Sequence, residues 1–213
     1  MKKLLLVAVA LWLMLAPALC MADATAAEGM LLFSDADYAC YTGAELGGKV
    51  TKMSAKARFF GGGACALIAT PNLPDSVAAI TGCSVHIVFD AHGYYLGFCR
   101  DGEVKDVKTD AYTLDLTGEK EYAFGWEIKG RTITLTLPTG KKVKYTGDAV
   151  AECGGGYAVW EHYMTESDKM LGTGPAFTLI EGAGETALRD DFSAAEGELT
   201  AAPTGQAYIC FAN

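Results

Sequence analysis

The segment 157–164 carries the side chains of this chain best suited to chemistry on a ligand. Trp160 and His162 fall on one face of an extended strand, because alternate residues of a strand point the same way. An indole ring offers apolar area to a sugar ring and an imidazole offers a hydrogen bond, so this pair predicts a stacking platform. The same two residues are equally typical of a core aromatic side chain and a satisfied histidine at the rim.

Glu161 lies between these two residues and points to the opposite face of the strand. A buried glutamate can act as the general acid in glycosidic cleavage, provided that a second carboxylate lies roughly 5–9 Å away. The sequence identifies no such partner. Glu161 is therefore a candidate catalytic residue only if the fold supplies a second acid.

Two further candidates for ligand binding lie on one side of a hairpin that spans residues 83–99. His86 and Tyr95 alternate there with apolar residues and share the more polar face. They could extend a binding surface begun by Trp160 and His162. The alternative is that an exposed sheet face simply needs polar residues.

Charge and spacing exclude several other kinds of site. The chain has a formal net charge of −9, and a nucleic-acid partner would require a basic patch. The histidines are scattered and no cysteine pair has the close spacing of a structural zinc site. We therefore expect no metal and no cofactor. A platform of Trp160 and His162 would have a glycan or cell-surface polysaccharide as its partner.

The first 22 residues predict a secretory signal peptide. Lys2 and Lys3 precede an apolar run over residues 4–19, and small residues allow cleavage after Ala22 or after Ala24. The run falls short of the ~20 residues that a membrane span needs. We expect a soluble mature chain, residues 23–213, that folds as a single β-sandwich domain. It would be secreted, periplasmic or held at the cell surface.

Six cysteines remain after removal of this leader. In an exported chain an even number suggests disulfides, although the sequence does not choose among the possible pairings. Cys83 and Cys99 flank a hairpin, but its apolar register puts them on opposite faces, so a bridge there would need a bulge. Cys40 and Cys210 lie in the first and last strand-like segments and could join the ends. The six disulfide candidates are Cys40, Cys65, Cys83, Cys99, Cys153 and Cys210.

The elements that must position all these residues are hairpins. In residues 121–145 apolar side chains alternate with polar ones on both sides of a turn at Lys129 and Gly130. The predicted pairs are Ile128 with Arg131, Trp126 with Ile133, Phe124 with Leu135 and Tyr122 with Leu137. In residues 83–99 the pattern predicts Phe89 opposite Tyr94, Ile87 opposite Leu96 and Val85 opposite Phe98. Each register gathers the apolar side chains on one face.

Short strands dominate the rest of the chain. Strands are expected over residues 30–33, 37–42, 50–60, 64–69, 103–107, 112–116, 176–180 and 207–211, among others. Glycine-rich turns and abundant aromatic and β-branched residues accompany them. The fold class predicted is all-β, an antiparallel sandwich of two sheets.

A resemblance to a known family follows from these features. The short, regularly spaced strands, the hairpin GWEIKGRTITLTLPTG and the later strand GGYAVWEHY resemble the concanavalin A-like lectin/glucanase superfamily. The resemblance implies a jelly-roll sandwich, with carbohydrate binding as a common use of its concave sheet. Glucanases of this superfamily carry the motif Glu-x-Asp-x-x-Glu on one strand, and this chain lacks it, so hydrolysis is not implied.

Three functional hypotheses remain. The first is a secreted non-catalytic binding module, with carbohydrate bound on one sheet face. The second is a carbohydrate-active enzyme, a glycoside hydrolase or lyase that uses Glu161. The third is a structural or adhesive surface protein. They differ in whether the fold presents an open groove and in whether two acids converge in it.

Overall fold

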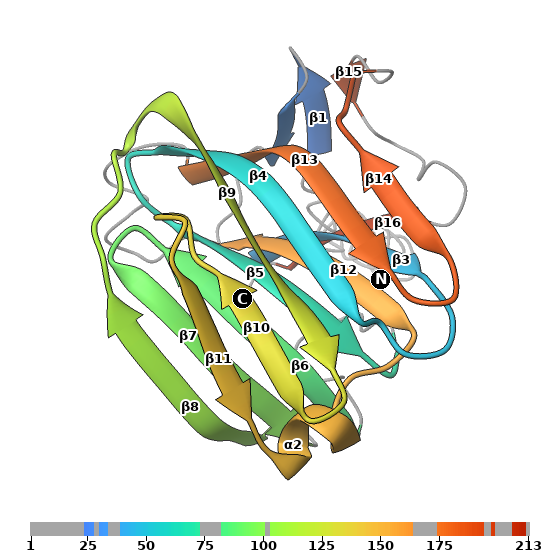
Figure 1. Cartoon of the computed structure of the whole chain (residues 1–213). Coiled ribbons are helices and arrows are strands. Elements are labelled where there is room, and N and C mark those ends of the chain that lie inside the picture. The colour runs from blue at the N-terminus through green and yellow to red at the C-terminus, as the bar shows by residue number, and fades with distance from the viewer. Residues whose placement is uncertain are drawn as a thin grey trace, which may run out of the picture.

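The chain folds into two antiparallel β-sheets that lie face to face (Figure 1). The computed structural model describes residues 24–27, 30–33, 39–72, 82–100, 103–163, 174–193, 197–198 and 206–211. The predicted all-β antiparallel sandwich is confirmed. The predicted signal peptide, residues 1–22, lies outside the described residues. Among the residues described, no helix has the length and hydropathy of a membrane span.

Within the described chain, one sheet has nine strands and is called sheet A. Across it run β11 (Lys142–Thr146), β10 (Thr132–Thr136), β9 (Thr117–Lys129), β4 (Lys52–Phe60), β13 (Gly174–Ala183), β2 (Met30–Phe33), β1 (Ala24–Ala27) and β15 (Gly197–Glu198), and β14 (Ala187–Asp190) pairs with β13. The seven-stranded sheet B contains, in order, β16 (Gln206–Phe211), β3 (Ala39–Glu45), β12 (Tyr157–Tyr163), β5 (Ala64–Thr70), β6 (Cys83–Asp90), β7 (Gly93–Arg100) and β8 (Glu103–Ala111). One short helix, α2 (Asp148–Glu152), follows β11.

The core lies between the two sheets and is filled by alternate residues of their strands. In β4, for example, Met53, Ala55, Ala57 and Phe59 are buried, while the residues between them are partly exposed. Phe89 of sheet B contacts Phe124 of sheet A, with ring centroids 4.7 Å apart. The period-2 pattern in the sequence thus marks the buried face.

Two tryptophans connect the sheets through hydrogen bonds as well as through packing. Trp126 of β9 donates its indole N–H to the carbonyl oxygen of Leu67 in β5, at 3.3 Å. Trp160 of β12, in sheet B, donates its indole N–H to the carbonyl oxygen of Ser54 in β4 of sheet A, at 3.1 Å. Each buried indole nitrogen therefore has a partner, as buried polar groups require.

The two predicted hairpins form, but only one has the predicted register. In β6 and β7, Phe89 lies opposite Tyr94, as predicted. In β9 and β10, Ile133 lies opposite Ile128 and Leu135 opposite Trp126, so the predicted pairs are wrong by two positions. The turn consists of Gly130 and Arg131 rather than Lys129 and Gly130, and the positive φ of 60° at Gly130 suits the first central position of a type II′ turn.

The strand predicted over residues 112–116 is also wrong. β8 ends at Ala111 and β9 begins at Thr117. The intervening chain instead bonds to the turn between β6 and β7, because Tyr112 N donates to His92 O and Leu114 N donates to Ala91 O. It serves as a connection from sheet B to sheet A.

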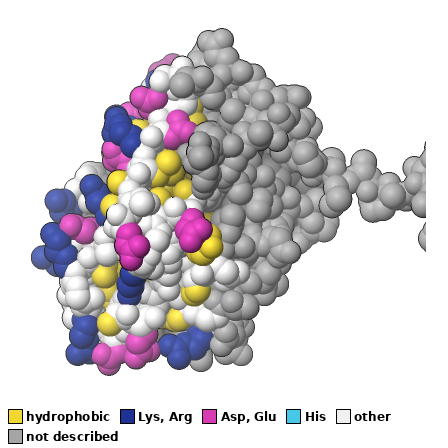
Figure 2. All heavy atoms as spheres, turned by 90° about the vertical axis from the view of Figure 1, so that its right-hand side faces the viewer, with side chains coloured by type: hydrophobic (Ala, Val, Ile, Leu, Met, Phe, Trp, Pro, Cys, Tyr) yellow, Lys and Arg dark blue, Asp and Glu magenta, His cyan; other side chains and the backbone are white. Residues whose placement is uncertain are grey.

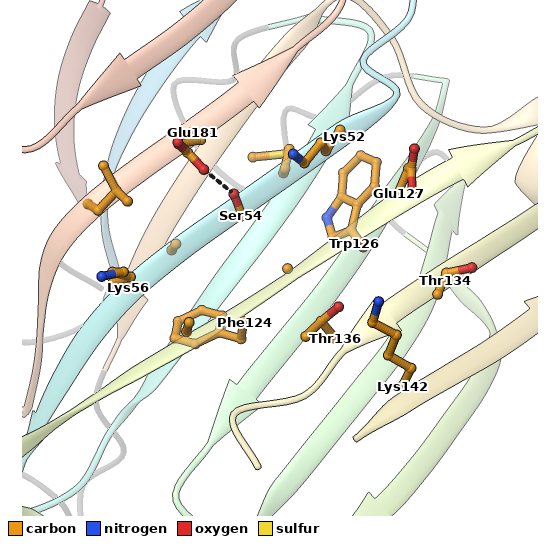
Figure 3. Close-up of a pocket in the computed structure, with 15 residues that line it drawn as sticks. Lys52, Ser54, Lys56, Phe124, Trp126, Glu127, Thr134, Thr136, Lys142 and Glu181 are labelled. Atoms are coloured by element: carbon orange, nitrogen blue, oxygen red, sulfur yellow. Dashed lines mark hydrogen bonds between the residues drawn. The ribbon is translucent and has the colours of Figure 1, made fainter. Parts of the chain in front are cut away.

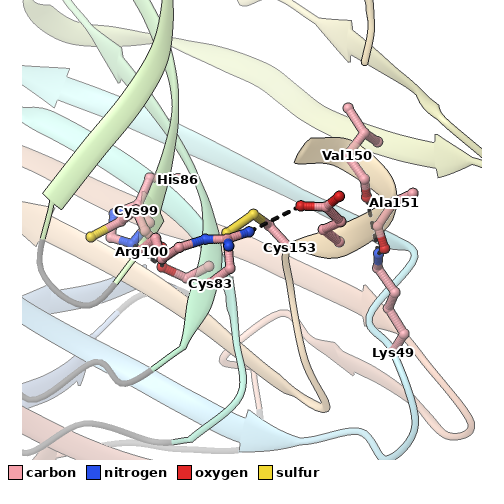
Figure 4. Close-up of a disulfide and its surroundings, with 10 residues drawn as sticks. Lys49, Cys83, His86, Cys99, Arg100, Val150, Ala151 and Cys153 are labelled. Carbon is pink, nitrogen blue, oxygen red and sulfur yellow. Dashed lines mark hydrogen bonds and ion pairs between the residues drawn. A yellow bond between two sulfur atoms is a disulfide. The ribbon is translucent and has the colours of Figure 1, made fainter. Parts of the chain in front are cut away.

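One disulfide joins Cys83 to Cys153, which the sequence did not single out. Cys99 lies opposite Ser84 in the register, and both Cys99 and Cys65 are buried free thiols. Next to the bridge, Arg100 pairs with Glu152 at 3.0 Å (Figure 4). The bridge joins the C-terminal end of α2 to the first residue of β6.

Lys49 holds the same helix from the other side (Figure 4). Its Nζ atom donates hydrogen bonds to the carbonyl oxygens of Val150, at 2.9 Å, and Ala151, at 2.7 Å. These carbonyls lie at the end of α2, where no helical N–H group is available to them. Burial lowers the pKa of Lys49 from its usual value.

We expect a second disulfide between Cys40 and Cys210. The two residues are Cα partners in neighbouring strands, β3 and β16, and direct cross-strand partners lie within the span that a disulfide bridges. Peptide mapping of the alkylated, unreduced protein should recover the two segments as one linked peptide. Recovery of either cysteine in alkylated form from the intact protein would contradict the pairing.

Candidate functional site

A trough with a volume of about 350 Å³ lies on the outer face of sheet A (Figure 3). We call it the outer trough. The side chains that reach it from the outward positions of five strands are Lys52, Ser54 and Lys56 of β4, Ala123, Gly125 and Glu127 of β9, Thr134 and Thr136 of β10, Lys142 of β11, and Leu179 and Glu181 of β13. The volume lies within the range of ~300–1,000 Å³ typical of small-molecule sites.

Small residues form the floor of the outer trough. Ser54 lies opposite Gly125 in the register of β4 and β9, and Ala123 is the next outward residue of β9. A Cβ atom at Gly125 would lie 2.5 Å from the carbonyl oxygen of Met53 and 2.8 Å from the Cα atom of Ser54. Since both of those atoms belong to the backbone, only glycine permits this close approach of the strands.

A β-bulge supplies an apolar side chain to the wall. The register between β13 and β4 shifts between Phe177 and Leu179. Phe177 belongs to the core, whereas Leu179 lies opposite Lys56 and lines the outer trough. Bulges of this kind re-aim a side chain to the other face of a sheet.

The carboxylates of the outer trough and its rim are held by neighbouring side chains. Glu127 pairs with Lys129 at 2.9 Å, and this hydrogen bond lowers the pKa of Glu127. Burial would raise the pKa of Glu181, but hydrogen bonds from Ser54, at 3.0 Å, and from Arg189 outweigh it and lower the pKa. These acids are therefore ionised and fixed in position at neutral pH.

The predicted platform of Trp160 and His162 lies in the core instead of on a surface. Trp160 is 0% exposed and His162 is 1% exposed, because their face of β12 is the one turned toward sheet A. Burial lowers the pKa of His162 to about 4, so this imidazole is neutral at physiological pH. Neither side chain offers a surface on which a sugar ring could stack.

The other predicted residues, Glu161, His86 and Tyr95, share the outward face of sheet B. Glu161 lies opposite Ala66 of β5, Ala66 lies opposite Val88 of β6, and Val88 lies opposite Tyr95 of β7. Glu161 is 7% exposed among apolar side chains, and burial raises its pKa to about 7. The roles predicted for these three residues remain predictions.

His86 belongs to a small polar group on the same face. Its Nε2 atom lies 2.8 Å from the hydroxyl of Ser84, and that hydroxyl also donates to the carbonyl oxygen of Cys99 at 3.3 Å. Burial lowers the pKa of His86 to about 4. The imidazole is thus neutral and engaged within the sheet.

The outer trough was not predicted from the sequence. A strand was expected over residues 50–60, but no site was assigned to it. A signal is present in β9, where the outward positions change from Glu121 to Ala123 and Gly125 and back to Glu127. Small residues inserted in a charged alternation mark a depression in a sheet surface.

Solved structures similar to this chain share its fold at low identity. No family model and no curated protein matches the chain. A β-1,3-1,4-glucanase from a mouse hindgut metagenome is 10% identical, with a TM-score of 0.46 over 78% of this chain and 81% of that one. A carbohydrate-binding module from Bacillus subtilis is 11% identical, with a TM-score of 0.42 over 76% and 80%. Chicken galectin 2 is 12% identical, with a TM-score of 0.39 over 58% and 89%.

These solved structures resemble the chain in fold alone. With TM-scores below 0.5, they carry no argument about ligand or activity.

Proposed function

We propose that the protein is an exported, non-catalytic binding module that holds a carbohydrate in the outer trough. The observation that supports this is the lining of the outer trough, where hydroxyl, carboxylate and ammonium groups lie beside apolar side chains such as Leu179 and Ala123. Sugars present hydroxyl groups around a ring with apolar patches, so such a lining matches their surface. Ser54 and Glu181 are already oriented by their mutual hydrogen bond.

Export is supported by two features. The disulfide between Cys83 and Cys153 fits an oxidising compartment, and the N-terminal residues have the composition of a secretory leader. Residues 23–213 would then be the mature protein. Strands from Ala24–Ala27 to Gln206–Phe211 contribute to the same two sheets, which supports one domain.

Hydrolysis with Glu161 is the second candidate. A carboxyl group with a pKa of about 7 is suited to general acid catalysis. Its described neighbours on this face, Val159, Ala66 and Ile68, are apolar. Asp90, an acid on the same face of β6, accepts hydrogen bonds from the N–H groups of His92 and Gly93 in a turn. In the part of the chain that the structure describes, no second carboxylate interacts with Glu161, so binding without catalysis is the better proposal.

A large side chain that fills the outer trough should weaken glycan binding while the protein stays folded. We expect Ala123→Trp to weaken glycan binding at least about tenfold, because Ala123 is exposed and its larger replacement would occupy the floor. Thr146→Trp is the matched control, since it places the same ring on the same sheet face outside the outer trough. Binding is measured on a glycan array and then by calorimetry.

Equal binding by the two variants would remove the outer trough from the proposal. If the unmodified protein bound no glycan, the proposal of carbohydrate binding would be contradicted. Circular dichroism and thermal unfolding of both variants establish that the fold persists.

A further inference from the structure

The outer trough contains two lysines that form no ion pair within 4.0 Å in the described part of the chain. Lys52 and Lys142 both line it and are both exposed. Among the described residues, the recorded ion pairs within 4.0 Å include neither of them. Both lysines are close enough to Glu127 to contribute to lowering its pKa. That carboxylate is already bonded to Lys129, so the two ammonium groups keep donors to offer.

The acids around the outer trough, by contrast, are each bonded to a neighbouring cation. Glu181 is bonded by Ser54 and Arg189. Glu121, at the rim, accepts from Lys56 at 2.8 Å and from Thr178 at 2.8 Å. The charge left available to a ligand is therefore positive.

A third cation continues the same row. Arg58 is the next outward residue of β4 beyond Lys56, and its Nε atom is buried without a hydrogen-bond partner among the described residues. A buried guanidinium nitrogen without an acceptor is unfavourable unless a ligand or water supplies one. The outward cations of β4 thus continue past the outer trough to Arg58, whose Nε atom could donate to an acceptor on a ligand.

The positive character of this face is local. The whole chain carries a formal net charge of −9. On the outward positions of sheet A, the described basic side chains outnumber the acidic ones. The basic residues are Lys52, Lys56, Arg58, Lys129, Lys142, Lys144 and Arg189, and the acidic ones are Glu119, Glu121, Glu127 and Glu181. Figure 2, which views the molecule from one side, shows basic and acidic side chains interspersed over the described part of the surface.

We propose that the ligand of the outer trough is an acidic glycan, one whose sugar units carry carboxylate or sulfate groups. The inference rests on the proposed function and names its ligand class. Lys52 and Lys142 would bind the anionic groups, since an ammonium group forms charge-assisted hydrogen bonds with carboxylate or sulfate oxygens. Thr134 and Thr136 line the outer trough between them and would bind the sugar hydroxyls. Trp126 and Phe124 also border the outer trough, but both side chains are buried in the core, so the proposal relies on the charged and hydroxyl groups.

The experiment uses the mature chain and four immobilised polymers. Heparin presents sulfate with carboxylate, polygalacturonate presents carboxylate alone, and mixed-linkage β-glucan and dextran are neutral. The test variant is Lys52→Gln combined with Lys142→Gln. The control variant is Lys144→Gln combined with Lys120→Gln, which removes the same charge from exposed positions outside the outer trough. Binding is measured at low and at physiological ionic strength.

We expect the unmodified protein to prefer at least one acidic polymer to both neutral ones. The test variant should lose about tenfold in affinity for that polymer, and the control variant less than about threefold. Preference for heparin over polygalacturonate would assign sulfate, and the reverse would assign carboxylate. Raised salt should weaken the interaction, because the paired groups are exposed.

Two results would overturn the inference. Equal losses in the test and control variants would indicate a general charge effect and no site at the two lysines. Binding to neutral glucan that is as strong as binding to acidic polymers, and abolished by Ala123→Trp, would leave the proposed function standing and remove the acidic ligand. Absence of binding to any polymer would contradict the proposed function itself.

Discussion

Replacement of Trp160 by alanine is expected to lower the free energy of unfolding by roughly 3–5 kcal/mol. Its indole is 0% exposed, so truncation leaves a cavity between the sheets. The carbonyl oxygen of Ser54 also loses the donor that lies 3.1 Å away. The effect is measured by urea unfolding at constant pH, with Tyr157→Ala, a partly exposed site in the same strand, as the control.

A second variant separates packing from hydrogen bonding. Trp160→Phe keeps most of the apolar volume but removes the N–H donor, so we expect a smaller loss of about 1–2 kcal/mol. A loss under about 1 kcal/mol for Trp160→Ala would contradict the core position. Lost glycan binding in the alanine variant would report a damaged fold and would not be evidence of ring stacking.

The pH dependence of stability should carry a signature of Glu161. Burial raises its pKa from 4.5 to about 7 in the folded chain, so between these values the folded state binds a proton that the unfolded state has released. The contribution of Glu161 to stability is therefore highest below pH 4.5, falls as the pH rises toward 7, and stays reduced above it. The shift corresponds to a loss of about 3 kcal/mol across this interval.

Glu161→Gln should remove most of this fall, because the amide does not ionise. The free energy of unfolding of both proteins is measured in urea at pH 5 and at pH 8. We expect the variant to be the more stable of the two at pH 8 and to change less between the two pH values. Glu119→Gln, an exposed carboxylate of β9, serves as the control. Identical pH profiles for the unmodified protein and Glu161→Gln would contradict a buried, proton-retaining carboxyl group.

The periodic parts of the sheets were predictable from sequence, and the register only partly so. A period-2 pattern fixes which residues share a face, and every register shifted by two positions preserves it. In the hairpin of β6 and β7 the side chain of Asp90 bonds the N–H groups of His92 and Gly93, so the turn and the pattern agree. In the hairpin of β9 and β10 the positive φ of Gly130 determines which two residues form the turn and hence the register. The apolar pattern alone does not reveal this φ angle.

The platform predicted on β12 could not be placed from the sequence, because β12 is buried on both faces. Val159 is 2% exposed on one face and Trp160 is 0% exposed on the other. An alternating strand pattern tells which residues lie together but not which group faces the second sheet when both groups are buried.

The pairing of Cys83 with Cys153 could not be predicted for a different reason. It depends on helix α2, a single turn with too few residues to show a helical period.

The bridge from Cys83 to Cys153 encloses strands β6 to β11, because Cys83 begins β6 and Cys153 follows 70 residues later in the chain. Arg131 and Lys141 lie in exposed turns inside that enclosure. Proteolytic clipping at either turn would leave the two fragments covalently joined and the strands still paired in both sheets. In a compartment rich in proteases, a nicked molecule of this kind would keep its shape until the bridge itself was reduced.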